Sequence, residues 1–106
     1  VFASLIVKTY KNLCENKREY VLSKQLLRSG TAIGALIREA DQGESKADFI
    51  HKMAIALKEA SETEYWIDLL AENDYLSCSE RDNLLEKSRE MVRLLTSIIK
   101  TAKSKK

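Results

Sequence analysis

His51 is the only histidine in this 106-residue chain, and Asp48 precedes it by three residues. On a helix this spacing puts a carboxylate and an imidazole on one face, which is half of a carboxylate-bridged dimetal site. A complete site needs a second such pair, and the sequence holds none. We therefore interpret His51 as a surface residue and expect no metal and no cofactor, with a site shared between subunits as the alternative.

Two further side chains, Cys14 and Cys78, could act as nucleophiles, and His51 is the only histidine that could serve as their base. An antiparallel helical bundle would place both cysteines at one end and His51 near the other. The cysteines also lack metal-type spacing, and the three glycines fit no phosphate-binding fingerprint. We expect no catalytic residue, no small-molecule substrate and no enzymatic activity.

Acidic side chains cluster at Glu59, Glu62 and Glu64. Paired carboxylates can act as general acid and base, but a run of charges on a helix usually faces solvent. At a rise of about 1.5 Å per residue, Glu64 lies level with Arg28, and Glu59 lies roughly level with Arg38. The sequence therefore predicts two structural ion pairs, Arg28–Glu64 at a partly buried site and Arg38–Glu59.

Four segments position these residues, each with apolar side chains at helical spacing. The strongest pattern is a seam with alternating four- and three-residue steps from Phe49 to Leu70. The chain has no Pro, and short connections make consecutive helices antiparallel neighbours. The prediction is an all-α, up-down-up-down antiparallel four-helix bundle in a single domain, 1–106. Its helices are expected at about 1–14, 19–42, 46–72 and 80–103, with 104–106 as a frayed tail.

The net charge of +2 is unevenly distributed. Residues 1–40 carry +4, residues 41–99 carry −6, and residues 100–106 carry +4. Either the two halves complement each other within one bundle, or unlike charges meet between subunits, or the basic tail binds a polyanion. The ends of the second and fourth helices share one pole, which suggests a nucleic-acid contact. Its candidate residues are Arg38, Lys100, Lys103, Lys105 and Lys106.

Two glycines, Gly30 and Gly34, lie on one face of the second helix. Each costs about 1 kcal/mol against Ala, so their spacing predicts close packing within the bundle or between subunits, with ligand access as the alternative. The third helix carries more apolar surface than one bundle can cover. We predict a closed homo-oligomer with Tyr65, Trp66 and Leu69 at the interface; a monomer with a wider core is the alternative.

The apolar runs are at most about five residues long, which is too short to span a membrane. No secretion signal opens the chain, so we expect a cytoplasmic protein with reduced cysteines. The chain starts without Met inside an apolar pattern, and residues upstream of Val1 are expected.

Three stretches carry a family resemblance: LSKQLLRSGTAIGA at 22–35, DFIHKMAIALKEA at 48–60 and ETEYW at 62–66. They resemble the bacterial four-helix-bundle proteins encoded in intervening sequences of 23S rRNA genes, also called ribosomal-protein-like. The resemblance implies an up-down bundle that assembles into small rings, pentameric in relatives. Related bundle proteins of diversity-generating retroelements associate with nucleic acid and a reverse transcriptase. The chain departs from the family at Leu36, where relatives commonly carry Asn, so a polar site formed by that Asn is not expected here.

Two functional hypotheses follow. The first is an RNA- or ribosome-associated accessory protein, supported by the resemblance, the basic half and the lysine tail. The second is a protein-interaction or scaffold module with no nucleic-acid role, supported by the wide apolar stripes and the face of Gly30 and Gly34. Salt-dependent binding to a polyanion separates the two.

Overall fold

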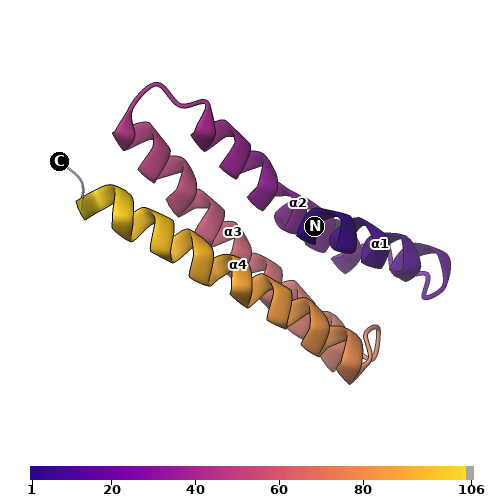
Figure 1. Cartoon of the computed structure of the whole chain (residues 1–106). Helices are drawn as coiled ribbons and strands as arrows, with labels where there is room; N and C mark the ends of the chain where they lie inside the picture. The colour runs from indigo at the N-terminus through magenta and orange to yellow at the C-terminus, as the bar shows by residue number, and fades with distance from the viewer. Residues whose placement is uncertain (105–106) are drawn as a thin grey trace.

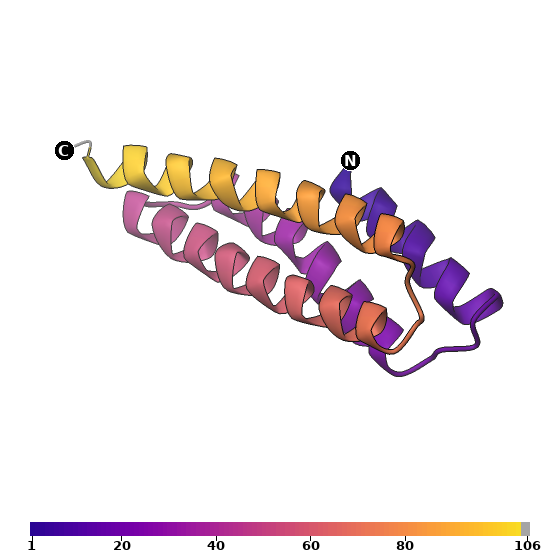
Figure 2. The same cartoon turned by 90° about the horizontal axis from the view of Figure 1, so that it is seen from below.

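A computed structural model describes residues 1–104, which form four α-helices (Figure 1). The helices are α1 (Phe2–Glu15), α2 (Leu22–Asp41), α3 (Lys46–Glu72) and α4 (Cys78–Ser104). The α2 helix packs against both α1 and α3, and α3 packs against α4. Consecutive helices run in opposite directions (Figures 1 and 2), so the predicted all-α, up-down-up-down bundle is confirmed.

The bundle measures 50 × 21 × 19 Å, and its two ends differ (Figure 2). The turns at 16–21 and 73–77 lie at one end, here called the two-turn pole. The turn at 42–45 and the end of α4 lie at the other, the single-turn pole. Because α1 has 14 residues while α3 and α4 have 27 each, α1 covers only the half of the bundle nearest the two-turn pole.

The packing of α3 follows the apolar seam that the sequence predicts. Its buried residues alternate in steps of three and four: Met53, Ala56, Ala60, Thr63, Ile67 and Leu70. Full burial of a side chain such as Ile67 or Leu70 contributes about 1.5–3 kcal/mol. Phe49, expected to open the seam, is only half-buried because it lies in the first turn of α3, at the end of the bundle.

The start of α4 is fixed by a reciprocal pair of hydrogen bonds. The Glu80 amide donates to Ser77 Oγ at 3.1 Å, and the Ser77 amide donates to Glu80 Oε1 at 2.9 Å. This capping box satisfies two backbone donors that the helix leaves free. The helix therefore begins at Cys78, two residues earlier than its apolar periodicity indicates.

A buried carboxylate, that of Glu19, marks the start of α2. It accepts hydrogen bonds from the amides of Ser23 (2.7 Å), Leu22 (3.1 Å) and Val21 (3.3 Å). Burial acts to raise the pKa of Glu19, but the three amide hydrogen bonds outweigh it, and the pKa is lowered overall. Glu19 therefore caps α2 from outside, and the helix begins at Leu22 rather than at the predicted residue 19.

The core contains four fully buried hydroxyl groups, those of Ser23, Ser29, Thr63 and Ser88. Thr63 Oγ1 donates to the Glu59 carbonyl oxygen at 2.8 Å and is hydrogen-bonded to Ser29 Oγ at 3.0 Å. Ser88 Oγ has no hydrogen-bond partner within residues 1–104. Such an unsatisfied buried group costs about 1–3 kcal/mol.

The C-terminal helix continues through Ser104, whose hydroxyl donates to the Thr101 carbonyl oxygen at 2.9 Å. The prediction that residue 104 belongs to a frayed tail is therefore wrong. Lys105 and Lys106, the rest of that tail, lie outside the described residues. Within residues 1–104, none of the helices combines the length and the apolar character that a membrane span requires.

Candidate functional site

Four basic residues lie along one exposed face of α4: Arg89, Arg93, Lys100 and Lys103. Steps of four, seven and three residues keep side chains on one side of a helix. At a rise of about 1.5 Å per residue, the row extends over about 21 Å. We call this row the basic stripe. A regular line of exposed cations is suited to contact the phosphates of a nucleic acid.

Most cations of the basic stripe are unpaired. Arg93, Lys100 and Lys103 take part in no ion pair within residues 1–104. Arg89 Nε lies 3.7 Å from Glu64 Oε1, a long contact at an exposed site. The exposed acids Glu86 and Glu90 lie along one side of the stripe and reduce its local potential.

The predicted nucleic-acid contacts are only partly brought together. Lys100 and Lys103 belong to the basic stripe, while Arg38 is exposed in the last turn of α2, a different helix at the same pole. The other two predicted contacts, Lys105 and Lys106, lie outside the described residues.

Sequence reasoning missed Arg89 and Arg93. The signal was present in their spacing from Lys100 and Lys103, but only the apolar rows of this helix were followed. The polar face of a helix has the same periodicity as its core face, and tracing that face as well finds all four cations.

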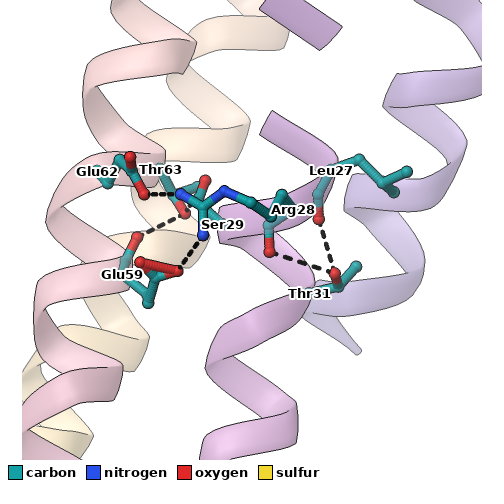
Figure 3. A network of polar contacts seen from close by, with 7 residues as sticks. All are labelled: Leu27, Arg28, Ser29, Thr31, Glu59, Glu62 and Thr63. Carbon is teal, nitrogen blue, oxygen red and sulfur yellow. Dashed lines mark hydrogen bonds and ion pairs between the residues drawn. The ribbon is translucent and has the colours of Figure 1, made fainter. Parts of the chain in front are cut away.

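Arg28 of α2 reaches two glutamates of α3 (Figure 3). Its Nη1 donates to Glu59 Oε2 at 2.9 Å, and its Nη2 donates to Glu62 Oε2. The hydrogen bond to Glu62, followed by that to Glu59, raises the pKa of Arg28. The predicted Arg28–Glu64 pair is wrong, because Glu64 contacts Arg89 of α4 instead. The expected burial is wrong too, since the Arg28 side chain is 52% exposed.

The predicted Arg38–Glu59 pair is also wrong. Glu59 is bound by Arg28, and the ion pair between α2 and α3 nearest Arg38 joins Lys52 to Glu39 at 3.4 Å. Both errors share a physical cause. The rise per residue fixes the height of a side chain along the bundle, but a salt bridge also depends on the direction in which the side chain leaves its helix.

The two glycines of α2 have different surroundings. A Cβ added to Gly30 would lie 2.8 Å from Ile6 Cγ1 of α1, so this glycine permits the close approach of the two helices. A Cβ added to Gly34 would have no atom within 4 Å. Close packing is therefore correct for Gly30 and wrong for Gly34 within this chain.

The aromatic residues expected at an interface lie on α3. Tyr65 is 58% exposed and meets the ring of Trp66 edge to face, with centroids 5.0 Å apart. Trp66 is half-buried against the core, and its Nε1 is buried without a partner within residues 1–104. Leu69 is half-buried. Their role in an interface stays a prediction.

The residues considered for chemistry do not converge. His51 is exposed on α3, and both Cys14 and Cys78 are free thiols. Cys14 Sγ lies 3.8 Å from Ser23 Oγ, which is a structural contact between α1 and α2. Within residues 1–104, no three His, Cys, Asp or Glu side chains are grouped so that they could hold a metal ion.

Comparisons with known proteins agree on one family. The chain matches the family described as 23S rRNA-intervening sequence protein over residues 1–97. It is also similar to a crystal structure from Bacteroides thetaiotaomicron VPI-5482, described as a protein with unknown function from the S23 ribosomal protein family. That similarity has 54% sequence identity and a TM-score of 0.92, and covers 93% of this chain and 92% of the other. No curated protein matches the chain.

Proposed function

Because this chain belongs to the 23S rRNA-intervening sequence protein family, we propose that it is a non-enzymatic, self-associating accessory protein that binds RNA. The observation that carries the RNA role is the basic stripe, Arg89, Arg93, Lys100 and Lys103, on one face of α4. The family description supports the choice of RNA among polyanions. We place this role in the cytoplasm.

The stripe would act mainly on the RNA backbone. Each phosphate neutralised by Lys or Arg releases condensed counterions, so affinity falls with rising salt. Three unpaired cations provide about three such contacts, and Glu86 and Glu90 work against them. We therefore expect weak binding with little sequence preference, because phosphate contacts position a protein without reading bases.

A binding titration at several salt concentrations tests this role. The probe is a fluorescent single-stranded RNA of about 20 nucleotides, and salt is varied between about 50 and 200 mM. The triple variant Arg93→Ala, Lys100→Ala, Lys103→Ala should lose most of the affinity. The slope of log K against log salt should flatten by about 2, since each lost contact with a single strand removes about 0.7.

The matched control removes three cations that lie outside the basic stripe, with Lys24→Ala, Lys46→Ala and Lys58→Ala. These residues are exposed on α2 and α3, so the change in net charge is the same. The control should keep the slope of the wild type. Equal losses in both variants would mean that net charge rather than the stripe drives binding. Arg38→Ala, tested alone, reports whether the end of α2 takes part.

The alternative is a protein-interaction or scaffold module with no nucleic-acid role. It is favoured by large apolar side chains that remain exposed, Tyr65 at 58% and Leu94 at 60%. Absence of RNA binding at about 50 mM salt would contradict the RNA role and support this alternative. Self-association is common to both proposals.

A further inference from the structure

The outer face of α1 is basic, and its charges form no ion pair within residues 1–104. Lys8 and Lys11 are exposed there beside Val7, which is 37% exposed. The following turn adds exposed Lys17 and Arg18. We call these five residues the basic face. Glu15 is an exposed acid beside them and lowers the net charge of the region to +3.

The outer face of α3 near the two-turn pole has the opposite charge. Tyr65, Asp68 and Glu72 are exposed along this face, and the following turn adds exposed Asp74. We call these four residues the acidic face, with a net charge of −3. Like the basic face, it carries one large side chain with apolar surface among the charges. Protein interfaces combine apolar side chains with polar ones at the rim, and each face offers one such apolar surface beside its charges.

The charges of the two faces have no ion-pair partners in the part of the chain that the structure describes. None of the seven charged residues of the two faces takes part in an ion pair within residues 1–104. The hydrogen bond to Asp82 raises the pKa of Arg81, and Asp68 helps to raise it by electrostatic attraction without an ion pair. The ion pair of Arg81 is with Asp82, at 3.0 Å. The α2 helix lies between α1 and α3 (Figure 1), so the two faces do not meet inside one bundle.

We propose that the basic face of one copy of this chain docks on the acidic face of the next, in a head-to-tail contact. This inference rests on the proposed self-association and names the surfaces that produce it. The occupant is a second copy because each face matches the other in charge and in having one exposed side chain with apolar surface. Two unlike faces on one molecule generate a ring or an open chain rather than a two-fold dimer.

The heights of the two faces favour a closed ring. Lys11 lies four residues before the end of α1, and Asp68 lies four residues before the end of α3. Both helices end at the two-turn pole, so both residues lie about 6 Å from that end at the standard rise. Neighbouring copies can therefore stand side by side without a shift along the bundle axis. Without an axial shift such a contact closes into a ring when the rotation between neighbours permits, whereas a shift at each step produces a helical filament.

Charge reversal tests the contact directly. One variant carries Lys8→Glu and Lys11→Glu, a second carries Asp68→Lys and Glu72→Lys, and a third combines all four changes. Sedimentation velocity measures the dissociation constant of assembly for each. Each single-face variant places like charges opposite each other and should raise that constant by about 10- to 100-fold, because each exposed pair contributes modestly. The combined variant restores unlike charges and should return to within about threefold of the wild type.

Mixing the two single-face variants gives a second readout. In the mixture, unlike charges meet where one variant contacts the other. Native mass spectrometry should show assemblies that contain both variants, whereas each variant alone stays largely dissociated. The matched control, Glu86→Lys with Glu90→Lys on α4, makes the same change in net charge as Asp68→Lys with Glu72→Lys and should assemble like the wild type. Thermal melting by circular dichroism identifies any variant that fails to fold, and Lys8→Ala with Lys11→Ala then replaces the reversal.

The possible outcomes distinguish this inference from the proposed self-association and the proposed RNA role. A wild-type mass near 12.1 kDa at every concentration would overturn both self-association and the contact. Assembly that survives both reversals, or that the combined variant does not restore, would overturn the contact and leave self-association standing. If the reversal on α1 lowers RNA affinity while assembly is unchanged, the basic face is a nucleic-acid contact and the inference is wrong.

Discussion

Substituting the two glycines of α2 separates helix propensity from packing. Gly34→Ala should stabilise the fold by about 0.8–1.0 kcal/mol, which is the propensity difference between Gly and Ala in a helix interior. Nothing offsets this gain, because an added Cβ has no atom within 4 Å. For a domain of this size the gain corresponds to a rise in Tm of roughly 4–8 °C.

Gly30→Ala gains the same propensity but meets Ile6. The added Cβ would lie 2.8, 2.9 and 3.0 Å from Cγ1, Cγ2 and Cδ1 of Ile6, well inside the normal carbon–carbon contact of about 3.5–4.0 Å. Ile6 is fully buried, so α1 itself must shift. Overpacking of this kind costs about 1–3 kcal/mol, which leaves a net loss of roughly 0–2 kcal/mol. The two variants should therefore differ by about 1–3 kcal/mol, from the contact with Ile6 alone.

Urea denaturation of both variants, followed by circular dichroism, measures this difference. A double-mutant cycle with Ile6→Ala assigns it: the cost of Gly30→Ala should largely disappear once the Ile6 side chain is removed. Equal free energies of unfolding for the two glycine variants would refute the close approach of α1 and α2 at Gly30. A loss of stability in Gly34→Ala would show that another chain packs against Gly34, and sedimentation of that variant would then reveal a changed mass.

The architecture could be predicted because periodicity determines it locally. The seam of α3 repeats without interruption from Met53 to Leu70, and only a helix places such residues on one side. Helix ends depend on single side chains instead. The hydrogen bonds between Ser77 and Glu80 start α4 two residues earlier than predicted. Glu19 was predicted to be the first residue of α2, but it lies before the helix and caps it with its side chain.

Ion pairs between helices could be predicted only in part. Such a pair depends on the direction in which each side chain leaves its helix as well as on its height along the bundle. Arg28 was expected to bind Glu64 of α3. Glu64 contacts Arg89 of α4 instead, and Arg28 binds Glu59 and Glu62, two other acids of α3. The different surroundings of Gly30 and Gly34 have a similar origin. They depend on where α1 crosses α2, which spacing within α2 cannot show.

Three further predictions concern single polar groups. Arg28→Ala should cost less than about 1 kcal/mol in denaturant melting, because its ion pairs are exposed to solvent; a larger loss that high salt does not reduce would contradict this. Ser88→Ala should raise stability by about 1 kcal/mol, because it removes a buried hydroxyl without a partner; a decrease would mean that Ser88 has a partner in solution. Glu19→Gln keeps the shape of the cap but loses its charge, and should cost about 1–2 kcal/mol at pH 7. Folding lowers the pKa of Glu19, so its contribution is complete above the unfolded value of about 4.3 and is lost as the pH falls through the lower folded value. The difference in unfolding free energy between wild type and Glu19→Gln should therefore stay constant from pH 7 to about pH 5 and shrink below about pH 4. A difference that grows on acidification would show that burial, rather than the amides of Val21, Leu22 and Ser23, dominates the environment of this carboxylate.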